Sequence, residues 1–139
     1  LWENDIMNRK TARDLAFKLL YQADIQKEEG EVVFDIAKEE YEIDDKSKEY
    51  IGNILYGVEE NAENINGIIS EKSEGWKINR ISKISLACLK LGIFEILYCE
   101  DIPDQVAANE AVSLAKLYEG EEAAKFVNGI LSVVIKEKA

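Results

Sequence analysis

Residues 80–99, RISKISLACLKLGIFEILYC, are the stretch of this chain that decides its fold. Their apolar residues recur at helical spacing and cover much of the circumference of the predicted helix. A surface helix keeps a polar face, whereas a helix that is apolar on most sides belongs at the centre of a bundle. The stretch therefore predicts a core helix around which other helices pack.

Both cysteines of the chain, Cys88 and Cys99, fall in this predicted core helix. Their separation in sequence places them roughly 16 Å apart along a helix axis, which is too far for a disulfide bond. We therefore expect two buried free thiols.

The segments on both sides of the core helix also repeat their apolar residues at helical rather than strand spacing. A single proline, Pro103, interrupts the chain, and proline suits the first turn of a helix. The GWKIN segment at 75–79 is the expected hinge. The pattern predicts an all-α protein of about seven helices. We expect them at 8–26, around 33–37, around 50–58, around 65–69, at 80–99, at 103–118 and at 121–136.

The length and composition describe an ordinary globular domain. A chain of 139 residues, 47% of them hydrophobic, can bury one core without disulfides or metals. No apolar run approaches the ~20 residues that cross a bilayer, and no secretory leader is recognisable. We therefore expect one domain at residues 7–139, located in the cytoplasm. Residues 1–6, LWENDI, fit no helical pattern, so we expect a leader or an upstream start.

Positive charge is concentrated in the first predicted helix of an acidic chain, whose formal net charge is −11. Residues 7–27 hold five basic and two acidic residues, whereas residues 28–75 hold four basic and fifteen acidic residues. A protein this acidic repels nucleic acid at long range, so a polyanion would have to bind a local patch. Charge runs are also commonly solvated surface, and this simpler interpretation stays open here.

The residue types exclude much catalytic chemistry. The chain contains no histidine, which removes the usual general base at neutral pH and the commonest neutral metal ligand. Two separated cysteines cannot form a structural zinc site, and no Gly-rich phosphate loop or nucleophile elbow is present. Pairs of adjacent acids occur, but in a chain with 28 acids they indicate surface charge. We expect no enzymatic activity, no metal and no cofactor.

One face of the first helix suggests a binding site. At about 100° per residue, Lys10, Arg13, Phe17 and Tyr21 form a stripe away from the apolar face. Two cations beside two exposed rings would suit single-stranded RNA, because cations neutralise phosphates and rings stack on bases. Alternatively, Phe17 and Tyr21 pack beneath a neighbouring helix while Lys10 and Arg13 point to solvent. The helical pattern alone leaves both interpretations open.

Four segments of the chain together resemble the NusB family of transcription antitermination factors. They are RKTARDLAFKLLYQ at 9–22, ISLACLKLGIFEIL at 84–97, DIPDQVAANEAVSLAK at 101–116 and KFVNGIL at 125–131. The last two, in this order, are the most specific part of the match. The resemblance covers nearly everything after Met7, and it implies an all-α fold with two helical subdomains around a long core helix.

The resemblance also implies a function. NusB-like proteins pair with NusE, a ribosomal protein with a second role in transcription, and the pair binds the boxA element of nascent RNA. This assembly helps RNA polymerase to pass terminators, notably on ribosomal RNA operons, so the elongation complex is an indirect partner. The positions that the resemblance implies for RNA binding are Arg9, Lys10, Arg13, Tyr21, Tyr118, Lys125 and Phe126.

The chain departs from many family members in having few arginines near its N-terminus. Three cations on single-stranded RNA would give a log-log salt slope of only about −2, so tight binding would need a partner that adds basic residues. The acidic residues 28–75 could attract such a protein.

Two alternative functions are a protein-interaction or dimerisation module with a masked RNA surface, and a NusB-like domain fused to a ribosomal RNA methyltransferase. These 139 residues hold no catalytic domain of that kind.

Overall fold

The computed structural model describes residues 7–73 and 77–138, and within these ranges the protein is all-helical. Its α-helices are α1 (Arg9–Gln26), α2 (Gly30–Glu40), α3 (Asp45–Glu60), α4 (Ala62–Lys72), α5 (Lys83–Tyr98), α6 (Asp104–Tyr118) and α7 (Glu121–Lys138). A short 3-10 helix at Ile78–Arg80 precedes α5. Among the described residues, every helix is too short or too polar to cross a lipid bilayer.

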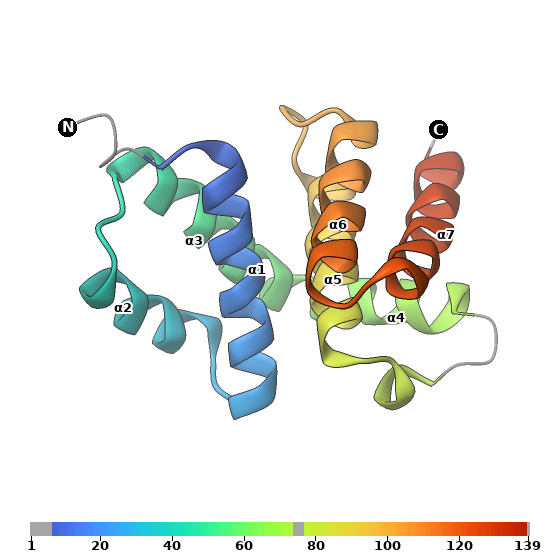
Figure 1. The fold of residues 1–139 in the computed structure, drawn as a ribbon, viewed down its shortest axis with the longest axis horizontal. Coiled ribbons are helices and arrows are strands. Elements are labelled where there is room, and N and C mark those ends of the chain that lie inside the picture. Colours follow the sequence, from blue (N-terminus) through green and yellow to red (C-terminus); the bar gives the residue numbers. More distant parts are fainter. Residues whose placement is uncertain (1–6, 74–76, 139) are drawn as a thin grey trace.

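Helix α5 forms the centre of the molecule. It buries side chains around its whole circumference, and it contacts α1 and α3 on one side and α6 and α7 on the other (Figure 1). Each large aliphatic side chain that becomes fully buried contributes about 1.5–3 kcal/mol. Because α1, α2 and α3 also pack on one another, as do α5, α6 and α7, the helices form two subdomains, α1 to α3 and α4 to α7. The two subdomains meet along α5, as the resemblance to the NusB family implied.

Short polar residues fix where α1 and α5 begin. The Asn8 side chain accepts a hydrogen bond from the Thr11 backbone N–H at 2.8 Å and caps α1. Ser82 caps α5 in the same way, with Ser85 as the donor. Such caps satisfy backbone donors that the first turn of a helix cannot pair internally. The cap at Ser82 explains why α5 begins at Lys83 rather than at residue 80.

Two glycines let helices approach α5 closely. A Cβ atom at Gly57 of α3 would lie 2.1 Å from the ring of Phe94 on α5. A Cβ atom at Gly92 of α5 itself would lie 2.7 Å from Leu131 on α7. Both distances are far inside van der Waals contact, so α3 and α7 pack on α5 at positions where larger side chains do not fit.

The structure confirms the predicted helical fold. The helices predicted at 8–26, 103–118 and 121–136 agree with α1, α6 and α7 to within two residues at each end. Both cysteines are buried free thiols, as expected. The predicted leader at residues 1–6 lies outside the described residues, as do Gly75 and Trp76 of the expected hinge.

Candidate nucleic-acid interface

The first turn of α1 presents two cations at the surface. Arg9 is exposed, and the Lys10 side chain is 76% exposed. The backbone just before them is fixed, because the Met7 N–H donates to Asp44 and the Ser47 hydroxyl donates to the Met7 carbonyl. The start of α1 is therefore tied to the start of α3, and both predicted cations are placed on a defined backbone.

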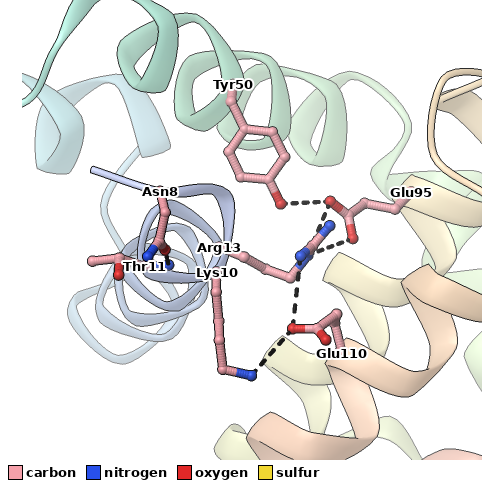
Figure 2. A network of polar contacts seen from close by, with 7 residues as sticks. All are labelled: Asn8, Lys10, Thr11, Arg13, Tyr50, Glu95 and Glu110. Atoms are coloured by element: carbon pink, nitrogen blue, oxygen red, sulfur yellow. Dashed lines mark hydrogen bonds and ion pairs between the residues drawn. The ribbon is translucent and has the colours of Figure 1, made fainter. Parts of the chain in front are cut away.

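Arg13, one turn further along α1, is buried. Its Nε atom lies 3.0 Å from Oε1 and 3.3 Å from Oε2 of Glu95, and the two side chains are 5% and 0% exposed. Tyr50 of α3 donates its hydroxyl hydrogen to Oε2 of the same carboxylate. Figure 2 shows the three side chains converging between α1, α3 and α5. We call Arg13, Tyr50 and Glu95 the buried triad.

The charges of the buried triad stabilise one another. Burial by itself would lower the pKa of Arg13, but the charge of Glu95 and the hydrogen bond to it outweigh that effect, so the pKa is raised. Burial and the Glu95 charge together raise the pKa of the Tyr50 hydroxyl. Arg13 and Tyr50 therefore keep their protons, and both oxygens of the Glu95 carboxylate accept hydrogen bonds.

Glu110 of α6 connects the buried triad to the surface. Its Oε1 atom lies 3.8 Å from Nη1 of Arg13 and 3.6 Å from Nζ of Lys10 (Figure 2). Its side chain is 28% exposed, so solvent weakens both ion pairs. The carboxylate nevertheless reduces the positive charge that Lys10 presents.

Tyr118, at the end of α6, docks on the middle of α1. Its hydroxyl donates to Oδ1 of Asp14 at 2.6 Å, and its ring stacks on Phe17 with centroids 5.2 Å apart. Nζ of Lys18 lies 5.7 Å from the centroid of the Tyr118 ring and pairs with Asp14. The hydrogen bond to Asp14 raises the pKa of the Tyr118 hydroxyl. Tyr118 is 37% exposed, so part of the residue remains open to solvent beside a cation.

Lys125 and Phe126 lie on α7, apart from the α1 cations. Lys125 is exposed, whereas Phe126 is half-buried and lines a surface hollow of about 420 Å³. The hollow is also lined by Arg80, and the hydroxyls of Ser82 and Ser85 donate to Glu119 there. Glu119 lines this hollow, and the next residue back in the chain, the predicted site residue Tyr118, contacts α1 through Asp14 and Phe17.

The predicted exposed stripe on α1 is wrong in part. Lys10 is exposed, but Arg13 and Phe17 are buried at 4% and 3% exposure, and Tyr21 is partly buried against the core. The reason is that neighbouring helices cover this side of α1 as well, since Glu95 of α5 binds Arg13 and the Tyr118 ring of α6 stacks on Phe17. The alternative interpretation, in which Phe17 and Tyr21 pack beneath neighbouring helices, is confirmed, although Arg13 does not point to solvent.

Sequence reasoning missed Tyr50, Glu95 and Glu110. One signal was present, because Glu95 is the only acidic residue within the apolar stretch 80–99. A carboxylate in a buried helix needs a cationic or hydrogen-bonding partner. The helical pattern of the chain does not say which of the basic residues provides it.

The arrangement of these helices and side chains can be compared with known proteins. A model of the NusB family matches residues 10–136. The chain belongs to the NusB family. Transcription antitermination protein NusB of Acetivibrio thermocellus is 47% identical over 132 residues, covering 95% of this chain and 91% of that protein. The NusB of Ruminiclostridium cellulolyticum is 48% identical over 130 residues, covering 94% and 90%.

Solved NusB structures share the fold. NusB of T. maritima superposes with a TM-score of 0.86 at 36% identity, covering 94% of this chain and 92% of that one. A chain from a complex of the antitermination factors NusB and NusE with double-stranded RNA gives a TM-score of 0.84 at 32% identity, covering 93% and 96%. These similarities confirm the resemblance to NusB and its two-subdomain helical fold.

Proposed function

We propose that this protein is a non-enzymatic transcription antitermination factor that binds boxA RNA together with NusE. In this role it supports the transcription of ribosomal RNA operons in the cytoplasm, with RNA polymerase as an indirect partner. We assign the function to residues 7–139 as one RNA-binding domain. Membership of a family whose named relatives are antitermination proteins supports the proposal.

The observation that carries the RNA contact is the exposed basic start of α1 in a chain of net charge −11. Arg9 and Lys10 reach solvent from a capped helix end that is tied to α3. Cations placed on a rigid backbone lose less conformational entropy when they bind phosphate. We propose Arg9 and Lys10 as the phosphate contacts, and Tyr118, Lys125, Phe126 and Tyr21 as further contacts.

Arg13 has a different role in this proposal. Its guanidinium is already paired with Glu95 and lies near Glu110, so an RNA phosphate would have to break a buried ion pair to reach it. We propose that Arg13 supports the interface by holding α1 against α5. The number of cations that face RNA is therefore smaller than the sequence suggested, which increases the need for a basic partner such as NusE.

The proposal is tested by titrating a boxA RNA oligonucleotide against the full chain, with and without NusE, at two salt concentrations. We expect weak binding by the protein alone and much tighter binding with NusE, with boxA preferred over a scrambled RNA of equal length. Equal affinity for the scrambled RNA in the presence of NusE would contradict specific binding. Sedimentation of the protein alone tests the competing function, because a stable dimer that dissociates when RNA is added would indicate a masked RNA surface.

A further inference from the structure

Arg9 differs from the other cations of α1, Lys10, Arg13 and Lys18, in the group that it contacts. Lys10 pairs with Glu110, Arg13 with Glu95, and Lys18 with Asp14. Of the residues that the structure describes, no carboxylate lies within ion-pair distance of Arg9. The Cζ atom of its guanidinium instead lies 4.3 Å from the centroid of the Tyr50 ring. Within the described residues, its positive charge therefore has no acidic partner.

Tyr50 has two ends with different surroundings. Its ring lies under the exposed guanidinium of Arg9, and its hydroxyl donates to the fully buried carboxylate of Glu95. Because Glu95 is held by Arg13 and has no freedom to move into solvent, it fixes the direction of the Tyr50 ring (Figure 2). The ring in turn restricts where the flexible Arg9 side chain can lie.

Where the face of a guanidinium packs against an aromatic ring, its N–H edges stay free. Stacking uses the face of the guanidinium plane, while phosphate oxygens bind to its edge through paired N–H groups. Arginine otherwise loses much rotamer freedom when it binds. A ring that holds the side chain in advance lowers this cost of binding.

We propose that Tyr50 is a positioning residue for RNA, which holds the guanidinium of Arg9 ready for a backbone phosphate while the buried carboxylate of Glu95 holds the Tyr50 ring. This inference rests on the proposed RNA-binding function. Tyr50 itself is partly buried in α3, and it acts through Arg9 rather than by touching the RNA.

The test is a double-mutant cycle on the full chain with NusE and boxA RNA. Tyr50→Leu removes the ring, and we expect it to weaken RNA binding by about three- to tenfold, which is the usual cost of ordering one long side chain at an interface. Tyr50→Phe keeps the ring but removes its hydrogen bond to Glu95, so it should weaken RNA binding less than Tyr50→Leu does. In an Arg9→Gln background, Tyr50→Leu should cause no further loss, because the side chain that it positions is gone.

The outcomes separate this inference from the proposed function. If the unmodified protein with NusE does not prefer boxA, the proposed function fails and the RNA role of Tyr50 fails with it. If boxA binding is specific but Tyr50→Leu weakens it equally in both backgrounds, only the positioning role is overturned.

A measurement on the unmodified protein tests the same inference if Tyr50→Leu does not fold. The Arg9 δ-methylene protons should show an upfield ring-current shift in NMR spectra, and ordinary unshifted positions would overturn the inference.

Discussion

Arg9 and Arg13 stand one turn apart on the same helix but belong to two different regions of the molecule. Arg13 lies in the buried junction between the two subdomains, where Glu95 neutralises it. Arg9 lies on the exposed start of α1, where it contacts the Tyr50 ring and no carboxylate of the described residues. The difference teaches that surroundings decide what a cation does, since the buried arginine holds helices together while the exposed one remains available to a polyanion.

The largest loss of stability is expected when the carboxylate of Glu95 is removed from the buried junction. Glu95→Gln keeps the size of the side chain but leaves the charge of Arg13 buried without its main partner, which should cost about 3–5 kcal/mol of unfolding free energy. Urea denaturation measures this loss. Glu110→Gln is the matched control, because its carboxylate faces the same arginine but is 28% exposed, and it should cost less than about 1 kcal/mol.

A triple variant separates stability from RNA binding in this junction. Arg13→Met, Glu95→Leu and Tyr50→Phe together replace the buried triad with apolar groups of similar size, and this exchange should be nearly neutral or stabilising. RNA affinity should fall only by the small loss that follows from removing the hydrogen bond between Tyr50 and Glu95. A large drop in the salt slope of RNA binding would show that Arg13 itself contacts phosphate.

The packing of α3 on α5 should give the next largest effect. Gly57→Ala would place a methyl group 2.1 Å from the Phe94 ring, and such overpacking typically costs about 1–3 kcal/mol. Gly67→Ala on α4 is the matched control, because its Cβ would meet no atom within 4 Å, and it should stabilise the helix by about 0.5–1 kcal/mol. Equal thermal stability of the two variants would contradict the close approach of α3 to α5.

The unfolding free energy of the protein should fall at alkaline pH because of the buried thiol of Cys88. Burial raises the pKa of the Cys88 thiol to about 12 from its usual 9.0. The unfolded chain therefore loses this proton above about pH 9 while the folded chain keeps it, so stability is intact below that pH and falls as the pH rises toward 12. Between pH 8 and pH 10 we expect the unmodified protein to lose about 1.4 kcal/mol more than Cys88→Ala. Equal losses in urea titrations would argue against this shift.

The smallest effect is expected at Tyr118, which contacts the middle of α1. Tyr118→Phe removes the hydrogen bond to Asp14 but keeps the ring stacked on Phe17. The loss should be about 0.5–1.5 kcal/mol in unfolding free energy, with RNA affinity nearly unchanged if the ring is the part that contacts RNA. A strong loss of RNA binding without loss of stability would indicate that the hydroxyl contacts RNA directly.

The fold could be predicted from the sequence because helical spacing and the apolar stretch 80–99 indicate the same helices. The site was harder to predict, because helical spacing shows which residues share a face of a helix but not which other helices cover that face. Lys10, Arg13 and Phe17 do share one side of α1, yet Glu110, Glu95 and Tyr118 meet them there from α5 and α6. These partners are 80 or more residues away in the chain, so only the tertiary fold places them.

The most direct test of the central claim compares Arg9→Gln with Arg13→Gln, two identical changes one turn apart. For Arg9→Gln we predict an unfolding free energy within about 1 kcal/mol of the original and a salt slope of RNA binding smaller by about 0.7. For Arg13→Gln we predict a loss of about 3 kcal/mol in stability and, under conditions where the variant remains folded, an unchanged salt slope. The opposite pattern, with Arg13→Gln reducing the salt slope at unchanged stability, would contradict the assignment of Arg13 to the junction and Arg9 to the RNA.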